Sequence, residues 1–93
     1  MSEKHFSTRV TVQNKDGIHA RPSVRIVEIA NNFQSDIYIQ KGDLKINGKS
    51  ILDLLTLAAS YGTLLTVEAF GDDAKEAVQA VSSFLSQEYN FPT

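Results

Sequence analysis

The chain's 93 residues, 42% of them hydrophobic, allow one domain, residues 1–93, with the single core that a small domain can bury. A formal net charge of −2 argues against a nucleic-acid-binding protein, and the absence of cysteine excludes disulfides and thiolate metal sites. No apolar signal segment opens the chain and no run approaches the ~20 apolar residues of a membrane span, so we expect a cytoplasmic protein that does not insert into a membrane.

In the first half of the chain, the hydrophobic pattern predicts a strand, a helix and a pair of strands. Residues 6–12 alternate in the period-2 pattern of a half-buried strand, with His5 as a solvated residue at its edge. Over residues 20–33 the apolar side chains recur at helical spacing. Residues 34–46 then predict two short strands, which a Gly-Asp turn separates.

The second half of the chain predicts a short helix, a strand and a long helix. Ser50 stands three residues before an aspartate, a weak capping-box pattern, so a short helix is expected to begin there. Residues 62–71 alternate as a strand does, and residues 72–87 form the clearest helix, which Asp72 or Asp73 is expected to cap. The apolar stripe of this last helix comprises Ala74, Ala77, Val78, Val81, Phe84 and Leu85.

The predicted order is therefore strand, helix, strand, strand, short helix, strand and long helix. Four strands with helices on one face make an α+β open-faced sandwich. Because the connections are too mixed for an all-parallel sheet, we expect the sheet to be antiparallel.

A histidine, an arginine and a proline stand together in "KDGIHARPS", residues 15–23, where the first helix is expected to begin. If His19 lies at the N-cap or just before it, the unpaired N–H groups of the first turn and the positive end of the helix dipole form an anion site. These surroundings disfavour an imidazolium, so His19 is expected to stay neutral and available as a nucleophile. Arg21 can bind phosphate oxygens through two donors, and the missing N–H of Pro22 costs nothing in a first turn.

His19 is therefore a candidate phosphoryl acceptor that needs neither a metal nor another cofactor. The ordinary alternative is that such a histidine is only a polar cap or a surface residue. The two histidines are far apart and have no carboxylate at ligand spacing, which argues against a metal centre. No acid–base pair accompanies His19, so a turnover enzyme is disfavoured.

Three segments together resemble the HPr family, the histidine-containing phosphocarriers of the bacterial sugar phosphotransferase system. The stretch "GIHARPS", residues 17–23, resembles the active-site signature of that family. The stretch "NGKSILDLL", residues 47–55, is similar to its regulatory-serine segment, and residues 62–85 resemble its last strand and last helix. The resemblance covers nearly the whole chain, in the same order and at the same spacing.

The resemblance implies a βαββαβα fold, with three helices on one face of a four-stranded antiparallel sheet, and a monomeric carrier rather than an enzyme. By position, His19 matches the residue that accepts a phosphoryl group, through Nδ1, from phosphorylated enzyme I and passes it to the IIA domain of a sugar permease. Ala20, Arg21 and Pro22 match the residues around the phosphate, and Arg21 matches the arginine that stabilises the phosphorylated state.

The resemblance also implies a regulatory and a docking role for the short helix. Ser50 matches the serine that an HPr kinase/phosphorylase modifies in many bacteria, and its alternative role is that of a plain N-cap. Ile51, Leu52 and Leu55 match an apolar docking patch, and we expect Leu52 and Leu55 to be the exposed pair. The alternative for each of the three is a place in the core, because a short helix has to bury one side.

The first helix departs from the family pattern, since many members carry lysines there that face acidic residues of enzyme I. Here Glu28 and Asn31 are among the exposed positions and Arg25 is the basic residue nearby. This leaves open a nitrogen-branch or catabolite-regulatory HPr-like protein that acts mainly through partner binding. A regulatory module that works through Ser50 is a further alternative, and so is a small-molecule-binding domain. The latter should show a ligand pocket or a Gly-rich phosphate loop, and the sequence shows neither.

Overall fold

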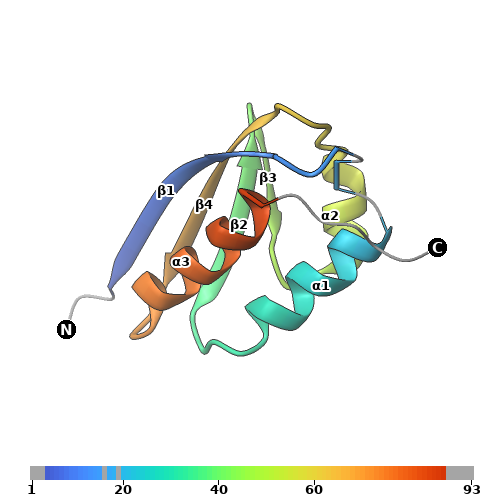
Figure 1. Ribbon diagram of the computed structural model, residues 1–93. Helices are drawn as coiled ribbons and strands as arrows, with labels where there is room; N and C mark the ends of the chain where they lie inside the picture. The colour runs from blue at the N-terminus through green and yellow to red at the C-terminus, as the bar shows by residue number, and fades with distance from the viewer. Residues whose placement is uncertain (1–3, 16, 19, 88–93) are drawn as a thin grey trace.

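The computed structural model describes residues 4–15, 17–18 and 20–87, and of Ala20 it describes the backbone but not the side chain. The order of helices and strands is the predicted βαββαβα (Figure 1). Their bounds are β1 (His5–Thr11), α1 (Ala20–Ala30), β2 (Asp36–Lys41), β3 (Leu44–Asn47), α2 (Ile51–Leu57), β4 (Leu64–Phe70) and α3 (Ala74–Leu85).

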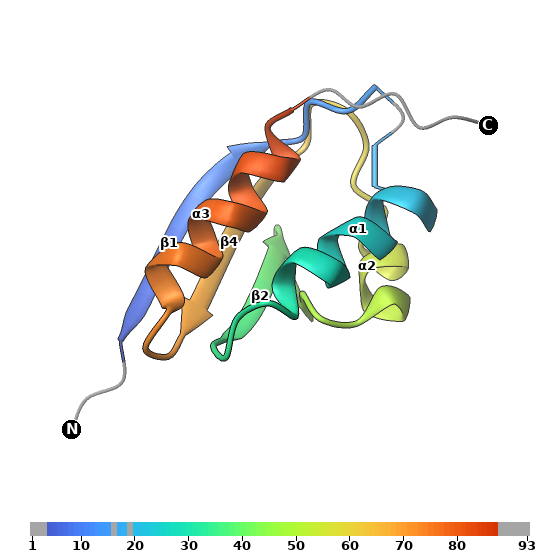
Figure 2. The same ribbon diagram turned by 60° about the horizontal axis from the view of Figure 1, so that its bottom comes forward.

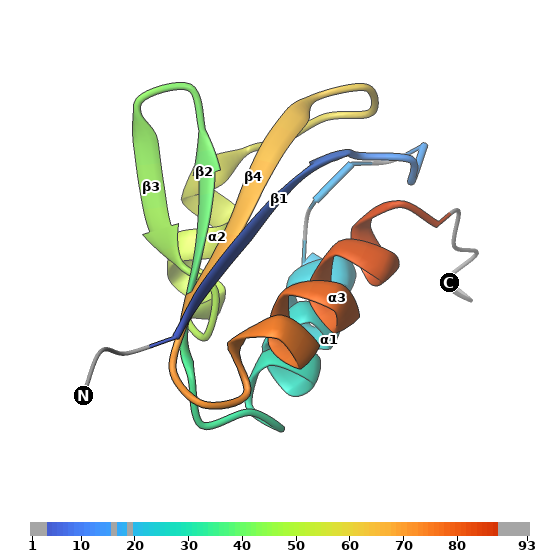
Figure 3. The same ribbon diagram turned by 90° about the vertical axis from the view of Figure 1, so that its left-hand side faces the viewer.

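The strands form one 4-stranded sheet in the order β1-β4-β2-β3, and all of its neighbouring pairs are antiparallel. The prediction of an antiparallel open-faced sandwich is therefore confirmed. The helices cover one face of the sheet and leave the other uncovered (Figure 3). On the covered face α3 lies along β1 and β4, whereas α1 packs beside α2 (Figure 2).

The core lies between the sheet and the helices, as period-2 and helical patterns together require. In β4 the alternate residues Leu65, Val67 and Ala69 are buried, and all of the predicted apolar stripe of α3 is buried above them. From α1, Ile26 and Ala30 are fully buried against the same core. A fully buried aliphatic side chain such as that of Ile26 stabilises the fold by about 1.5–3 kcal/mol.

The first two elements differ from their predictions, α1 in where it ends and β1 in how much of it is buried. Helix α1 ends at Ala30 rather than near Phe33, because the amide of Phe33 bonds the carbonyl of Ala30 in a tighter turn. Phe33 still packs against the core, which is why the apolar pattern runs past the end of the helix. Strand β1 is less buried than predicted, with Val10 its one buried residue. The reason is that β1 is an edge strand, and a groove beside α3 leaves Phe6 open to solvent.

The uncovered face carries one ionic cluster that joins three strands. The Glu68 carboxylate of β4 accepts hydrogen bonds from Lys45 Nζ at 2.7 Å and from His5 Nε2 at 2.8 Å. The bond from Lys45 is the main reason that the pKa of Glu68 is lowered. The His5 ring also stacks on Phe70, with ring centroids 4.5 Å apart, so His5 has specific partners and is not simply solvated.

Asp73 is the N-cap residue of α3, as predicted for one of the two aspartates, but its side chain does not cap the helix. Its carboxylate instead accepts hydrogen bonds from Gln34 N at 2.8 Å, from Ser35 N at 2.9 Å and from the Ser35 hydroxyl. These bonds tie the loop between α1 and β2 to the start of α3. Because they stabilise the charged form, above all the bond from the Ser35 hydroxyl, the pKa of Asp73 is lowered from its ordinary value.

We expect Asp73→Asn to destabilise the protein at neutral pH and to matter less in acid. The folded pKa lies below the ordinary value of 3.8, so the stabilisation is present above that pH and is lost as the pH falls through the folded pKa. Urea unfolding from pH 7 down to acid should show the two proteins converging. Asp72→Asn is the matched control, and an equal effect of both changes would contradict the role of Asp73.

Candidate functional site

The candidate phosphate site lies at the start of α1. The helix begins at Ala20, so the last residue before it in the sequence is His19, which together with the Ala20 side chain lies outside the described residues. The Arg21 side chain is exposed and makes no hydrogen bond or ion pair with any residue that the structure describes, so its guanidinium is available to a ligand. Pro22 is buried in the first turn, where it leaves no unpaired backbone donor.

The electrostatics of the first turn favour an anion. No acidic side chain lies in the first turn of α1, so nothing in that turn offsets the positive end of the helix dipole. The nearest ion pair described on the helix joins Arg25 to Glu28 at 3.5 Å, with both side chains mostly exposed. An exposed ion pair of this kind contributes little. It does not involve Arg21, which among the described residues is the unpaired cation in the first turn of the helix.

The segment that leads into α1 is held by the connection between α2 and β4. The amide of Val12 donates to the Thr63 carbonyl at 2.9 Å, and the Val12 carbonyl accepts from Gly62 N at 2.8 Å. Farther along, Ile18 N donates to the carbonyl of Ala59 at 2.7 Å. The backbone on the N-terminal side of His19 is therefore fixed by residues that lie far away in the sequence.

Gly17 makes this contact possible for two reasons. Its φ of +71° lies in the left-handed region, which side chains disfavour. A Cβ there would also lie 2.6 Å from the Ala59 carbonyl oxygen, which is closer than real Cβ contacts come. The side chain of the buried Asn14 closes the loop by donating to the Gly17 carbonyl at 3.3 Å.

Ser50 is the N-cap of α2, with φ −115° and ψ 117°, and its hydroxyl accepts a hydrogen bond from Asp53 N at 3.2 Å. The Asp53 carboxylate reaches back to Asn47 N at 3.2 Å rather than to the amide of Ser50. Beside it, Lys49 Nζ donates to the Phe33 carbonyl at 2.8 Å, which links the start of α2 to the end of α1. The capping role of Ser50 is thus present without any modification, and its phosphorylation stays a prediction.

The outward side of α2 is apolar. Leu54 and Leu57 are fully buried, whereas Leu52 is 75% exposed, Leu55 41% and Ile51 39%. We call Ile51, Leu52 and Leu55 the α2 patch. Helix α2, which carries the α2 patch, packs beside α1 (Figure 2). Its use in docking stays a prediction.

From the sequence, Ser23 after Pro22 could add a hydroxyl donor near the site, but the structure buries its side chain. Ser23, in the second turn of α1, is fully buried, and its hydroxyl makes no hydrogen bond with the residues described. A buried hydroxyl without a partner costs about 1–3 kcal/mol.

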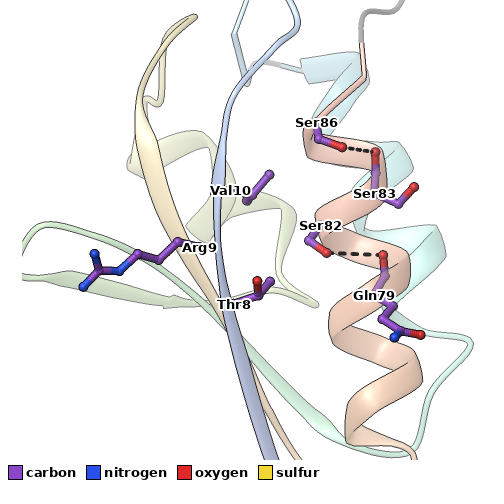
Figure 4. A pocket seen from close by; sticks show the side chains of 7 residues that line it. All are labelled: Thr8, Arg9, Val10, Gln79, Ser82, Ser83 and Ser86. Carbon is purple, nitrogen blue, oxygen red and sulfur yellow. Dashed lines mark hydrogen bonds between the residues drawn. The ribbon is translucent and has the colours of Figure 1, made fainter.

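A second hollow, of about 390 Å³, runs between β1 and α3 (Figure 4). Thr8 and Val10 point toward α3, whereas Arg9 points away from it. From α3 it is lined by serines and by Gln79, and no carboxylate or histidine is among the described residues that line it. The described lining therefore offers no acid–base pair and no charged side chain aimed into the groove.

The comparisons with known proteins agree with one another. Residues 6–87 match the family described as PTS HPr component phosphorylation site. The chain is 40% identical over 80 residues to the HPr-like protein Crh of Bacillus subtilis, which covers 86% of this chain and 94% of that protein. It is 38% identical over 77 residues to phosphocarrier protein HPr of Neisseria meningitidis, with 83% and 86% covered. The crystal structure of a phosphocarrier protein HPr from Bacillus anthracis matches with a TM-score of 0.84 at 37% identity, over 87% of this chain and 96% of that one.

The described part of the chain lacks two features. No helix there is long and apolar enough to cross a bilayer. Nor do the described residues include a group of three or more His, Cys, Asp or Glu side chains that could hold a metal ion.

We expect Ser23→Ala to raise the free energy of unfolding by about 1 kcal/mol, because it removes a buried hydroxyl that has no partner. Urea denaturation would measure the change. Ser82→Ala is the matched control, since that serine is also helical but its hydroxyl donates to the Gln79 carbonyl. A loss of stability in Ser23→Ala would contradict the prediction.

Proposed function

The chain belongs to the HPr family of phosphocarrier proteins, and on that basis we propose that His19 accepts a phosphoryl group from phosphorylated enzyme I and passes it to the IIA domain of a sugar permease. As a member of this family the protein is a carrier of the phosphotransferase system and not a turnover enzyme. The observation that carries the proposal is the first turn of α1. It follows His19 directly, contains no acidic side chain and presents the unpaired Arg21.

The proposed transfer needs a neutral nucleophile and a place for negative charge. A ring nitrogen of His19 forms a bond to phosphorus as the bond between phosphorus and the donor breaks, and the donor keeps the electron pair. The phosphoryl group then brings a charge of about −1.5 to −2, as phosphate esters do near neutral pH. Arg21 and the free N–H groups at the start of α1 are suited to stabilise that charge, and the reverse sequence delivers the group to the next acceptor.

The α2 patch is the proposed docking surface for enzyme I and for the IIA domain. Leu52, at 75% exposure, is the most exposed of the large hydrophobic residues described. Exposed apolar side chains grouped beside a reactive site are typical of a protein–protein contact. In this proposal the protein acts in the cytoplasm as a monomer. Its single domain, residues 1–93, supplies every residue that the proposal uses.

A regulatory role through Ser50 is the second candidate, and the similarity to the HPr-like protein Crh favours it. In that role an HPr kinase/phosphorylase would modify Ser50, and a partner would recognise the product in a nitrogen-related or catabolite-regulatory branch. Two features oppose such a modification. The Ser50 hydroxyl is half-buried and already accepts the capping hydrogen bond, and the nearby Asp53 carboxylate would repel an added phosphate. The presence of His19 in the chain favours the carrier role.

A direct phosphorylation assay tests the carrier role. With phosphoenolpyruvate and the cognate enzyme I, the wild type should gain one acid-labile phosphoryl group, seen by intact mass before and after acid treatment. His19→Ala should gain none, whereas His5→Ala and Ser50→Ala should gain it as the wild type does. The absence of an adduct on the wild type would contradict the carrier role and favour regulation through Ser50.

We expect Arg21→Glu to slow phosphoryl transfer in both directions by on the order of 10²-fold, because like charge repels the phosphoryl oxygens. Stopped-flow or quenched transfer to and from enzyme I would measure both rates. Arg25→Glu, about one turn farther along α1, should have a much smaller effect on the transfer step. Rates like those of the wild type in Arg21→Glu would show that the backbone donors suffice.

A further inference from the structure

Ala58 has an unusual backbone conformation. It follows α2 as the C-cap residue, with φ 49° and ψ 45°, and among the described residues it is the only non-glycine residue with positive φ. Glycine usually occupies such a position, because a Cβ is crowded in the left-handed conformation. Strain of this kind persists where the surrounding structure imposes it, and it is often found near functional sites.

The structure shows what imposes the conformation. The next carbonyl, that of Ala59, accepts the hydrogen bond from Ile18 N at 2.7 Å, the shortest of the described backbone bonds that join turns and loops. Ala59 and Ile18 are both buried, so water cannot readily replace this bond. Gly17 lies against the same carbonyl, so closely that no side chain could be placed there.

The other side of the turn is tied to α2 and to the sheet. Leu57, the last residue of α2, is fully buried and fixes the end of the helix in the core. Lys41 Nζ, from the end of β2, donates to the Ala58 carbonyl at 3.4 Å. The direction of the Ala59 carbonyl therefore follows from where α2 ends and from the left-handed turn at Ala58.

We propose that Ala58 is a positioning residue, whose left-handed turn aims the Ala59 carbonyl at the Ile18 amide and so couples α2 to the segment that leads into α1. Because α2 carries Ser50 and the α2 patch, a partner that displaces the end of α2 also displaces Ile18. The consequence for phosphoryl transfer rests on the proposed function, whereas the coupling of α2 to Ile18 does not.

Three variants test the proposal. Ala58→Val puts a β-branched side chain where it cannot easily adopt the left-handed conformation, and Ala58→Gly keeps that conformation without strain. Ala80→Val makes the same change of side chain within α3, away from the turn, and is the matched control. Native-state amide exchange compares Ile18 with the core amide of Val67, and single-turnover transfer from enzyme I measures function.

In Ala58→Val we expect the exchange of Ile18 relative to Val67 to be about tenfold faster than in the wild type, as the loss of one buried hydrogen bond allows. We also expect slower phosphoryl transfer. Ala58→Gly and Ala80→Val should both keep the wild-type exchange ratio and rate. If Ala58→Val does not fold, Ala58→Leu, which is not β-branched, applies a milder form of the same strain.

The proposal is overturned if Ala58→Val matches Ala80→Val in both the exchange ratio and the transfer rate, because Ala58 is then only the residue at which a helix ends. If Ile18 exchanges faster but the transfer rate is unchanged, the coupling of α2 to Ile18 is supported and its consequence for phosphoryl transfer is overturned. A wild type that accepts no phosphoryl group would contradict the proposed function instead, and the exchange ratio would still decide the role of the turn.

Discussion

Two connecting segments meet backbone to backbone at one end of the sheet, and the position of α1 depends on that contact. Gly17 can lie against the Ala59 carbonyl only because it has no Cβ, and the bond from Ile18 N to that carbonyl then fixes the chain just before the helix. Four residues after Ile18, Pro22 is buried in the first turn of α1. Arg21 is exposed at this helix end, whose electrostatics suit a phosphate.

Much of the fold could be predicted from the sequence, because the sheet and α3 follow local periodicity. The alternation of Leu65, Val67 and Ala69 fixes which face of β4 is buried, and the burial found agrees with it. The extent of α1 was wrong because Phe33 continues the apolar pattern beyond the last helical bond. The exposure of β1 depends on its place at the sheet edge, which no local pattern of the strand reports.

The candidate site divides in the same way. The residue types of the motif predict its chemistry, since an arginine at a helix start favours a phosphate wherever that helix lies. The backbone contact that holds the segment before the site could not be predicted. Ala59 is far from Ile18 in the sequence, and its carbonyl is a backbone group common to every residue type. The same holds for Asp73, whose carboxylate suggests a cap for its own helix but binds Ser35 of a distant loop. A side chain's partner is a property of the whole fold.

The strand order has a consequence for how the protein is made. Because β4 is the one described strand that pairs with β1, residues 5–11 cannot find their partner during synthesis until residues 64–70 have left the ribosome. The β2–β3 hairpin, in contrast, joins neighbours and can form early. Pairings between distant segments slow folding, so closing the sheet at β1 is expected to be a late step in the life of each nascent chain.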